Sequence, residues 1–505
     1  MKNKNIVFAL IIIILAVILG VLLKCLVFTG SSKTNNMQMG FETLNEANGE
    51  VEEIKASASQ EDKRGEVSYS DYTCKINLDS LEITGIGATV NDGTITISTG
   101  GIYYFSGTLA DGNIVINARD NDNVILVFDN VSISCSKTAV INGVNAKNIY
   151  INLVDGTTNT FTDGTEYTEF TEDDEPNGTI FSKTDLLING TGKMIVNSYY
   201  EDGIVSKDDL IITNAIIEVT SADDGIRGKD SVDIKDAIIT VISKEDGIKS
   251  NNDEDDSKGY VIIDNSTITV KAGDDGIHSE KDLIISSGII NIEESNEGLE
   301  GMFVQINGGT INVKASDDGI NVADGSSSSE LGMGMQKSSN SNVQIQINGG
   351  TIYVDAEGDG LDANGTILMT GGTLTVAGTS SNGNGALDFD SGFKVTGGNL
   401  VVYGASGMWQ NPSLTSEQYS LCFGINGSSG DEITIKDEEG DIISEFKTDK
   451  TYGAILVSND SLKDGNTYTL YINGEEKSSL KIESIVTSNL ENGGMMVKNR
   501  QNINR

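Results

Sequence analysis

Apolar and polar residues alternate along most of this chain, in short segments separated by corners of small residues. The segments LIITNAIIEV (residues 210–219), LIISSGIINI (283–292) and VQINGGTINV (304–313) each hold two such alternations. A period of two with many β-branched residues predicts β-strands, and the repeat shows no helical spacing. Glycine pairs such as Gly308–Gly309 lie at the corner, where a Cβ would obstruct the bend. We therefore predict an all-β chain.

A short acidic turn (EDGI, DDGI, NEGL or GDGL) recurs between these segments. Its glycines are Gly203, Gly225, Gly247, Gly276, Gly298, Gly319 and Gly360. Without the insertions at residues 251–259 and 324–341 the period is about 22 residues. One coil of that length with three short strands predicts a parallel β-helix, whose inward Ile, Val and Leu form a continuous core. Leucine-rich repeats would need a helix or a Leu-x-x-Leu frame, and calcium β-rolls use nonapeptides.

The pattern also predicts the domain organisation. Residues 1–28 are expected to form a signal anchor or transmembrane segment, because residues 6–23 are apolar and uncharged. A cleaved export signal is the alternative, and either one predicts an extracellular, cell-surface protein. Residues 29–66 are interpreted as a flexible linker, 67–415 as the β-helix domain, 416–489 as a small antiparallel β module that caps it, and 490–505 as a polar tail.

Composition excludes several classes of protein. Among 505 residues there are 58 Gly but only 2 Pro, which excludes collagen, and the segments dense in Ile and Val exclude wholesale disorder. The 75 acidic and 34 basic residues give a net charge of −41. Nucleic acid would repel such a polyanion, so we predict no nucleic-acid partner. Four Cys residues are too few for a disulfide scaffold, and whether Cys74 and Cys135 pair stays open.

The acidic turns supply candidate metal ligands. Equivalent residues of parallel coils stack about 4.8 Å apart, so the second acid of each turn forms a column beside the first acids. Carboxylates at that distance repel by roughly 3 kcal/mol at an effective dielectric near 20. Ca²⁺ accepts several oxygen ligands and would relieve the repulsion. The predicted Ca²⁺ ligands are Asp202, Asp223, Asp224, Asp246, Asp274, Asp275, Glu297, Asp317, Asp318 and Asp359.

Two simpler interpretations accompany this prediction. Asp-Gly is a common turn dipeptide, so the same acids are alternatively solvated turn carboxylates with no metal. The single histidine, His278, is predicted to be a surface residue of a turn, and no His/Cys cluster suggests zinc.

Three groups of motifs resemble a known family. They are TGGIYYFSGTLADGNIVIN (residues 99–117) with DGTTNTFTDG (155–164), the DDGI repeats, and SGMWQNPS (406–413). Over about residues 70–473 the chain resembles the clostridial right-handed β-helix carbohydrate-binding family. The resemblance implies a right-handed β-helix, bound calcium, binding of cellulose and acidic sugars, and a fold like that of polysaccharide lyases. It implies no ligand residue beyond the acids named above.

The first functional hypothesis is a surface-displayed, monomeric protein that binds polysaccharide. Aromatic residues are only 6% of the chain and Trp409 is the sole Trp, whereas flat cellulose is usually gripped by rows of exposed rings. The sequence therefore favours acidic sugars over cellulose, and it identifies no carbohydrate-binding residue. Four tyrosines could stack on sugars, although packing is the usual role of Tyr in a strand: Tyr199, Tyr200, Tyr353 and Tyr403.

The alternatives are a calcium-dependent polysaccharide lyase of the pectate type and a non-catalytic adhesin or spacer rod. A lyase needs a base for the proton next to the uronate carboxylate. The candidate bases follow the acidic turns: Lys207, Lys229, Lys249 and Lys281, with Arg227 nearby. Because a catalytic base is needed only once, their recurrence favours pairing with the acids and a protein that is not an enzyme.

Overall fold

The computed structural model describes residues 71–170, 175–324 and 342–490, which all belong to one compact unit, Glu46–Arg505. Every regular element in these residues is a β-strand, which confirms the all-β class. Thirty-eight strands join one large, mostly parallel sheet, and four form a separate antiparallel sheet. The described residues contain no helix long and apolar enough to cross a membrane. The expected anchor (1–28), linker (29–66) and nearly all of the tail (490–505) lie outside them.

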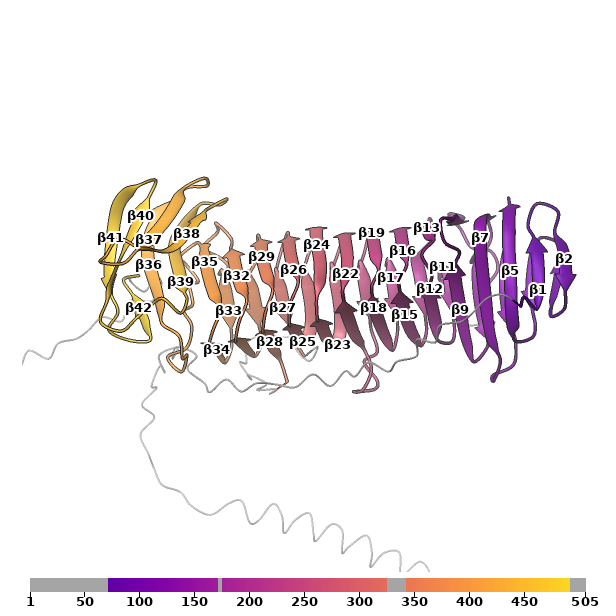
Figure 1. The fold of residues 1–505 in the computed structure, drawn as a ribbon, viewed down its shortest axis with the longest axis horizontal. Coiled ribbons are helices and arrows are strands. Elements are labelled where there is room, and N and C mark those ends of the chain that lie inside the picture. Colours follow the sequence, from indigo (N-terminus) through magenta and orange to yellow (C-terminus); the bar gives the residue numbers. More distant parts are fainter. Residues whose placement is uncertain (1–70, 171–174, 325–341, 491–505) are drawn as a thin grey trace, which may run out of the picture. The chain divides into compact units, whose positions relative to one another are not determined.

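The large sheet is a series of coils. In the middle of the chain, each strand pairs in parallel with the strand three places further on: β14 (Asp202–Ser206) with β17 (Ile226–Gly228), and β15 (Asp209–Thr213) with β18 (Ser231–Lys235). The chain thus makes one coil for every three strands, and successive coils lie side by side (Figure 1). This pairing is the arrangement that the 22-residue repeat predicts.

Each coil contributes to three rows of strands. The first row follows the acidic turn and contains β4 (Thr94–Ile97), β6 (Asn113–Asn117), β8 (Ile141–Asn145), β11 (Gly178–Ser182), β14, β17, β20 (Ile248–Ser250), the starts of β23 (Ile277–Ile285) and β25 (Leu299–Ile306), β27 (Ile320–Val322), β30 (Leu361–Ala363) and β33 (Leu387–Phe389).

The second row contains β1 (Cys74–Asn77), the starts of β5 (Gly101–Leu109) and β7 (Asn123–Cys135), β9 (Asn148–Leu153), β12 (Leu186–Asn189), β15, β18, β21 (Tyr260–Asp264), the ends of β23 and β25, β28 (Gln344–Ile347), β31 (Thr366–Met369) and β34 (Gly392–Val395). The third contains the ends of β5 and β7, β10 (Thr158–Asp163), β13 (Lys193–Asn197), β16 (Ile216–Thr220), β19 (Ile238–Ile242), β22 (Ser266–Lys271), β24 (Gly288–Glu294), β26 (Thr310–Ala315), β29 (Thr351–Ala356), β32 (Thr373–Ala377) and β35 (Asn399–Gly404).

Alternate side chains of every row point inward and stack into columns. In the first row the residue after the glycine of the acidic turn is always apolar and fully buried: Ile204, Ile226, Ile248, Ile277, Leu299, Ile320 and Leu361. Burial of each such side chain contributes roughly 1.5–3 kcal/mol. The next residue along each strand points outward, so the acidic turn and the following outward position lie on one face of every coil.

The glycines of the acidic turns are required by the distance between coils. A Cβ on Gly225 would lie 2.3 Å from Cγ1 of Val241 and 2.5 Å from the carbonyl oxygen of Gly247 in the next coil. Gly319 has the same surroundings, with Val354 at 2.2 Å and the carbonyl of Gly360 at 2.6 Å. By contrast, the corner glycine Gly309 has a φ of +97°, a conformation that L side chains rarely adopt.

Both ends of the large sheet are covered by antiparallel pairing. At the N-terminal end β2 (Glu82–Gly85) pairs with β1, and β3 (Ala88–Asn91) with β4. At the other end β39 (Tyr452–Ser458) pairs with β35 and with β36 (Ser420–Gly427), which also pairs with β42 (Val486–Ser488). The four-stranded sheet follows in the order β38 (Ile442–Lys447), β37 (Glu432–Lys436), β40 (Thr467–Ile472) and β41 (Glu475–Lys481). Covered ends remove edges that would recruit other chains.

Candidate functional site

The second acids of the turns form one column along the coils, here called the acidic ladder. Strand register aligns them because Ile204 lies opposite Ile226, and each ladder acid stands two residues before such a position. The ladder acids are Asp202, Asp224, Asp246, Asp275, Glu297, Asp318 and Asp359.

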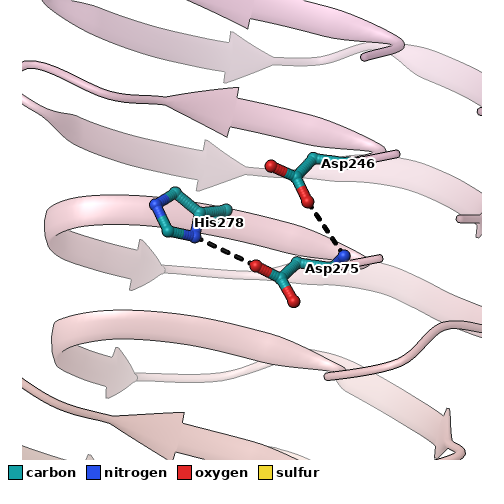
Figure 2. A group of neighbouring side chains, drawn as sticks. All are labelled: Asp246, Asp275 and His278. Carbon is teal, nitrogen blue, oxygen red and sulfur yellow. Dashed lines mark hydrogen bonds and ion pairs between the residues drawn. The ribbon is translucent and has the colours of Figure 1, made fainter. Parts of the chain in front are cut away.

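Most ladder carboxylates hold neighbouring coils together. Oδ1 of Asp202 accepts a hydrogen bond from the backbone N–H of Asp224 at 3.1 Å, and Oδ1 of Asp224 accepts one from Asp246 at 3.1 Å. Asp246 does the same for Asp275 at 2.9 Å, as Figure 2 shows. Further along, Oδ1 of Asp318 accepts from the N–H of Asp359 at 2.6 Å. One oxygen of each of these acids is therefore engaged by the backbone, which leaves the second for another partner.

The outward residue three positions after each ladder acid forms a second column, here called the outer column. Register places Val205 opposite Arg227, Arg227 opposite Lys249, and Lys249 opposite His278. The column continues through Glu300, Asn321, Asp362 and Asp388. Its side chains change from cationic to acidic or neutral along the array, so the ladder meets two different environments.

In the compensated half, Arg227, Lys249 and His278 neutralise the ladder acids Asp202, Asp224, Asp246 and Asp275. Arg227 donates to Oδ2 of Asp202 and its Nε lies 3.8 Å from Oδ2 of Asp224. Lys249 Nζ is 2.6 Å from Oδ2 of Asp246 and 3.6 Å from Oδ2 of Asp224. These four acids are buried, so the interpretation as solvated turn carboxylates is wrong for them.

His278 is not a surface residue of a turn, contrary to the sequence-based expectation. It lies in β23 with its side chain 20% exposed, and its Nδ1 is 3.0 Å from Oδ2 of Asp275 (Figure 2). The same nitrogen contacts Glu300. Burial by itself would lower the pKa of His278, but the surrounding carboxylates raise it to about 12. The imidazolium therefore stands in the outer column as a third cation after Arg227 and Lys249.

The acidic half consists of Glu297, Asp318 and Asp359 of the ladder with Glu300, Asn321, Asp362 and Asp388 of the outer column. Carboxylate oxygens of Asp318, Asp359 and Asp362 lie within 4.8 Å of one another, as do those of Asp275, Glu297 and Glu300. In the described part of the chain no Lys, Arg or His pairs with Asp318, Asp359 or Asp362. The ladder acids here are half-buried and more accessible than those of the compensated half.

Asn321 adds an uncharged oxygen to the acidic half. Its Nδ2 donates to Oε2 of Glu297 at 2.8 Å, while its Oδ1 is buried and has no hydrogen-bond partner among the described residues. A buried carbonyl oxygen without a donor costs free energy, and a hard cation would satisfy it.

Burial raises the pKa of ladder carboxyl groups in both halves, but protein cations oppose this rise at ladder acids of the compensated half. The pKa of Asp202 is raised to about 8 by burial, against the opposing effect of Arg227. In the acidic half burial raises the pKa of Asp362 to about 8, and neighbouring Asp318 and Asp388 add to the rise. Burial likewise raises the pKa of Glu297 to about 7 and that of Asp318 to about 6. Burial is the largest cause of the raised pKa at Glu297, Asp318 and Asp362, and neighbouring carboxylates add to it.

The structure divides the predicted metal ligands into three groups. Asp246, Asp275, Glu297, Asp318 and Asp359 fall in clusters of at least three potential ligands. Asp202 and Asp224 instead have Arg227 as partner. The first acids Asp223, Asp274 and Asp317 belong to no such cluster within the described ranges, and Asp274 and Asp317 are exposed.

Sequence reasoning missed the outer column, although a signal for it exists. Glu300, Asn321 and Asp362 each stand three residues after a ladder acid, at the first outward position of the strand that follows the turn. A further cluster of Asp208, Asp209 and Asp230 lies at the start of the second row. There Lys258 and the amide of Asn252 bind Asp230, both at 2.5 Å.

The candidate lyase bases are engaged by carboxylates. Lys207 lies 3.2 Å from Glu175, Lys229 3.8 Å from Glu254, and Lys281 3.3 Å from Asp256. Burial alone would lower the pKa of Lys249, but Asp246 and Asp224 raise it above its ordinary value, which disfavours a neutral amine. Cys74, Cys135 and Cys422 are all free and buried, so Cys74 and Cys135 do not pair.

Part of this chain is similar to proteins that are described as containing a carbohydrate-binding domain. A family described as "Carbohydrate-binding domain-containing protein" matches residues 91–333. A protein of the same description from Acetivibrio thermocellus is 36% identical over 147 residues, which cover 29% of this chain and 50% of that relative. The chain thus spans half the length of that relative.

A solved structure entitled "Structure of the polysaccharide lyase-like protein from C. thermocellum, Gadolinium derivative" shares 32% identity. The match covers 50% of this chain and 96% of that one, with a TM-score of 0.41.

Proposed function

We propose that this protein is a non-catalytic, calcium-dependent binder of acidic polysaccharide, built on a right-handed parallel β-helix. The acidic half carries this proposal, because no Lys, Arg or His of the described chain pairs with its clustered carboxylates Asp318, Asp359 and Asp362. The matching family is described as carbohydrate-binding, which supports a polysaccharide as the partner.

The donor set of the acidic half fits Ca²⁺. This ion accepts six to eight oxygen ligands and combines carboxylates with uncharged oxygens. Asp318, Asp359 and Asp362 would supply carboxylate oxygens at one position, and Glu297 and the Oδ1 of Asn321 at a neighbouring one, where His278 already contacts Glu300. The bound ion would offer open coordination positions to a uronate carboxylate. Asp202, Asp224 and Asp246, which the sequence suggested as further ligands, are less suitable because protein cations accompany them.

Calcium also resolves an electrostatic conflict. The protein has a net charge of −41, and a polyuronate is a polyanion as well. Salt screens their repulsion only over about 8 Å at physiological ionic strength. A divalent cation between an acid of the acidic half and a sugar carboxylate reverses the sign of the interaction at the point of contact.

The pairing of the candidate bases favours a binder over a lyase. Elimination from a uronate needs a basic group that faces the sugar. Lys207, Lys249 and Lys281 instead contact carboxylates of the protein. Cell-surface location, an anchor in residues 1–28 and a monomeric state complete the proposal, and cellulose is retained as a second polysaccharide to test.

Affinity electrophoresis of the full-length protein in gels containing polygalacturonate tests the proposal. Calcium should retard migration, while chelator should abolish the retardation and magnesium should substitute poorly, because Mg²⁺ demands near-octahedral geometry and releases water reluctantly. Asp318→Asn with Asp362→Asn should remove retardation, whereas Glu245→Gln, an exposed first acid of the compensated half, should not.

Two outcomes would contradict the proposal. Equal retardation in calcium and chelator would exclude bridging by the ion, and retention on cellulose alone would exclude acidic sugar as the main partner. Unsaturated product detected by absorbance on polygalacturonate would instead indicate a lyase.

A further inference from the structure

The outer column continues beyond the compensated half into an apolar segment. Towards the N-terminus, Val205 lies opposite Phe181, and Phe181 opposite Asn142. Phe181 and Val205 point outward, away from the β-helix core, yet both are buried in a small separate cluster with Ala139 and Tyr167. The residues between β10 and β11 contribute Tyr167, which lies over this part of the column. An apolar surface thus adjoins the charged face on the same side of the coils.

Three aromatic rings form the outer layer of this cluster, here called the aromatic patch: Tyr167, Phe170 and Tyr200. The rings of Tyr167 and Tyr200 stack with centroids 4.2 Å apart and planes inclined by 19°. The ring of Phe170 lies 6.1 Å from that of Tyr200, inclined by 51°. The patch is therefore an angled surface of ring faces and edges.

Only part of the aromatic patch is needed to cover the cluster beneath it. Tyr167 is buried and its hydroxyl donates to Oδ2 of Asp163 at 2.7 Å, so it is fixed in place. Phe170 is 43% exposed, and Tyr199, the neighbour of Tyr200, is 56% exposed. Large apolar side chains with this exposure remain available for a ligand.

The other two tyrosines that the sequence suggested for sugar stacking are engaged. Tyr403 is buried and donates to Oδ1 of Asp449 at 2.7 Å, and Tyr353 also binds Asp449. Both therefore contact a residue of the C-terminal β module. The structure thus selects Tyr199 and Tyr200 over Tyr353 and Tyr403 and adds Phe170, which the sequence did not suggest.

We propose that the aromatic patch, with the exposed Tyr199 that precedes Tyr200 in the chain, is a stacking subsite for one pyranose ring of the polysaccharide. This inference rests on the proposed function and places a second point of contact on the same face. The C–H faces of a sugar ring match aromatic faces, and its hydroxyls need polar partners at the rim. Lys207, which lies 5.9 Å above the ring of Phe181, would supply one, and it is 3.2 Å from Glu175, which Lys183 also contacts at 2.6 Å.

The spacing of the coils gives the distance between this subsite and the acidic half. From Val205 the outer column passes Arg227, Lys249 and His278 before it reaches Glu300, which is four steps of about 4.8 Å, or roughly 19 Å. A pyranose unit in a linear chain has a length close to one such step. A polysaccharide that lies along the coils would therefore span from the aromatic patch to the acidic half with a few sugar residues between them.

Binding to two linked points predicts a dependence on chain length. An oligogalacturonide too short to span both points gains from one of them, whereas a longer one gains from both through effective concentration. Titration of the full-length protein in calcium with galacturonate dimer, tetramer and octamer should show affinity rising sharply once the chain spans both points.

Variants separate the two points of contact. Phe170→Ala with Tyr199→Ala should weaken octamer binding roughly tenfold to a hundredfold, because each ring contributes roughly threefold to tenfold, and should leave dimer binding and calcium affinity unchanged. Tyr471→Ala, which removes a half-buried Tyr from β40, is the matched control and should have no effect. Circular dichroism melts check that all variants fold.

The outcomes of this experiment also separate the two proposals. If the wild type binds polygalacturonate in calcium but the double variant binds octamer equally well, the stacking subsite is refuted and the proposed function stands. If the wild type binds no acidic polysaccharide at all, the proposed function fails. Loss of dimer and octamer binding to the same extent would place the rings next to the calcium position and refute the two-point arrangement.

Discussion

The two halves of the acidic ladder share one motif and one backbone but differ in how their charge is balanced. In the compensated half Arg227, Lys249 and His278 stand beside buried acids, so the chain provides its own cations. In the acidic half the same outer positions hold Glu300, Asn321 and Asp362. The repeat therefore builds first a column of acids that pair with cations of the chain, and next to it a column of clustered acids for which we propose calcium. The difference lies in one residue per coil.

The largest expected effect comes from removing a cation of the compensated half. Arg227→Ala leaves Asp202 buried without its cation and Asp224 with Lys249 alone, and should lower the free energy of unfolding by about 3–5 kcal/mol. The loss should be equal in calcium and in chelator, measured by urea denaturation. Lys314→Ala, at an exposed position of the third row, is the control and should change stability by at most about 0.5 kcal/mol. If calcium restored the stability of the Arg227→Ala variant, the predicted difference between the two halves would be contradicted.

Removal of calcium should lower the stability of the protein through the acidic half alone. At a calcium concentration 100 times the Kd, binding to the native state stabilises it by about 2.7 kcal/mol, and chelator should remove that increment. Asp362→Asn should abolish the calcium-dependent gain. In chelator this variant should be as stable as the wild type or more so, because one repelling carboxylate is gone. Thermal melts with and without chelator measure both effects, and a wild-type Tm insensitive to chelator would contradict the assignment.

Substitution of the turn glycines should cost a similar free energy of unfolding in both halves, because the spacing of the coils is the same. Gly225→Ala and Gly319→Ala each bring a Cβ to within about 2.6 Å of the next coil's carbonyl and valine, and each should cost roughly 1–3 kcal/mol. Gly383→Ala is the control, because its Cβ would meet nothing closer than 3.6 Å. A large cost at only one of the two sites would show that the backbone of the halves differs.

Stability should depend on pH in the metal-free acidic half. The folded-state pKa of Asp362 is about 8, above its ordinary value near 3.9, so the folded protein binds more protons than the unfolded chain between these limits. Stability in chelator should therefore fall as pH rises from about 4 to 8, by up to roughly 1.4 kcal/mol per pH unit for such a group. Asp362→Asn should flatten the slope in urea melts. A slope that rises with pH, or one that the variant leaves unchanged, would contradict this assignment.

The smallest effect is expected at the first acids. Asp274 is exposed and belongs to no ligand cluster of the described chain, so Asp274→Asn should change the free energy of unfolding by no more than about 0.5 kcal/mol. Its calcium response should equal that of the wild type. If isothermal titration showed that Asp274→Asn no longer binds calcium like the wild type, the first acids would be calcium ligands after all.

The sequence by itself determined the coil. Alternation of apolar residues, the period of about 22 and the turn glycines led to stacked three-strand coils, because these features depend on local geometry that repeats. The same regularity placed the ladder acids in one column. Covered ends were also foreseeable, since the strand pattern changes near residue 420.

Only the tertiary structure decided which acids have partners. Whether Asp202 meets a cation depends on Arg227 of the next coil, and His278 lies between Asp275 and Glu300 only because the next coil brings Glu300 beside it. Likewise Tyr200 and Phe170, 30 residues apart, meet over Phe181 through the path of the chain between β10 and β11. A local motif repeats the acid in every coil, but charge balance and exposure depend on neighbours distant in sequence, which no single repeat specifies.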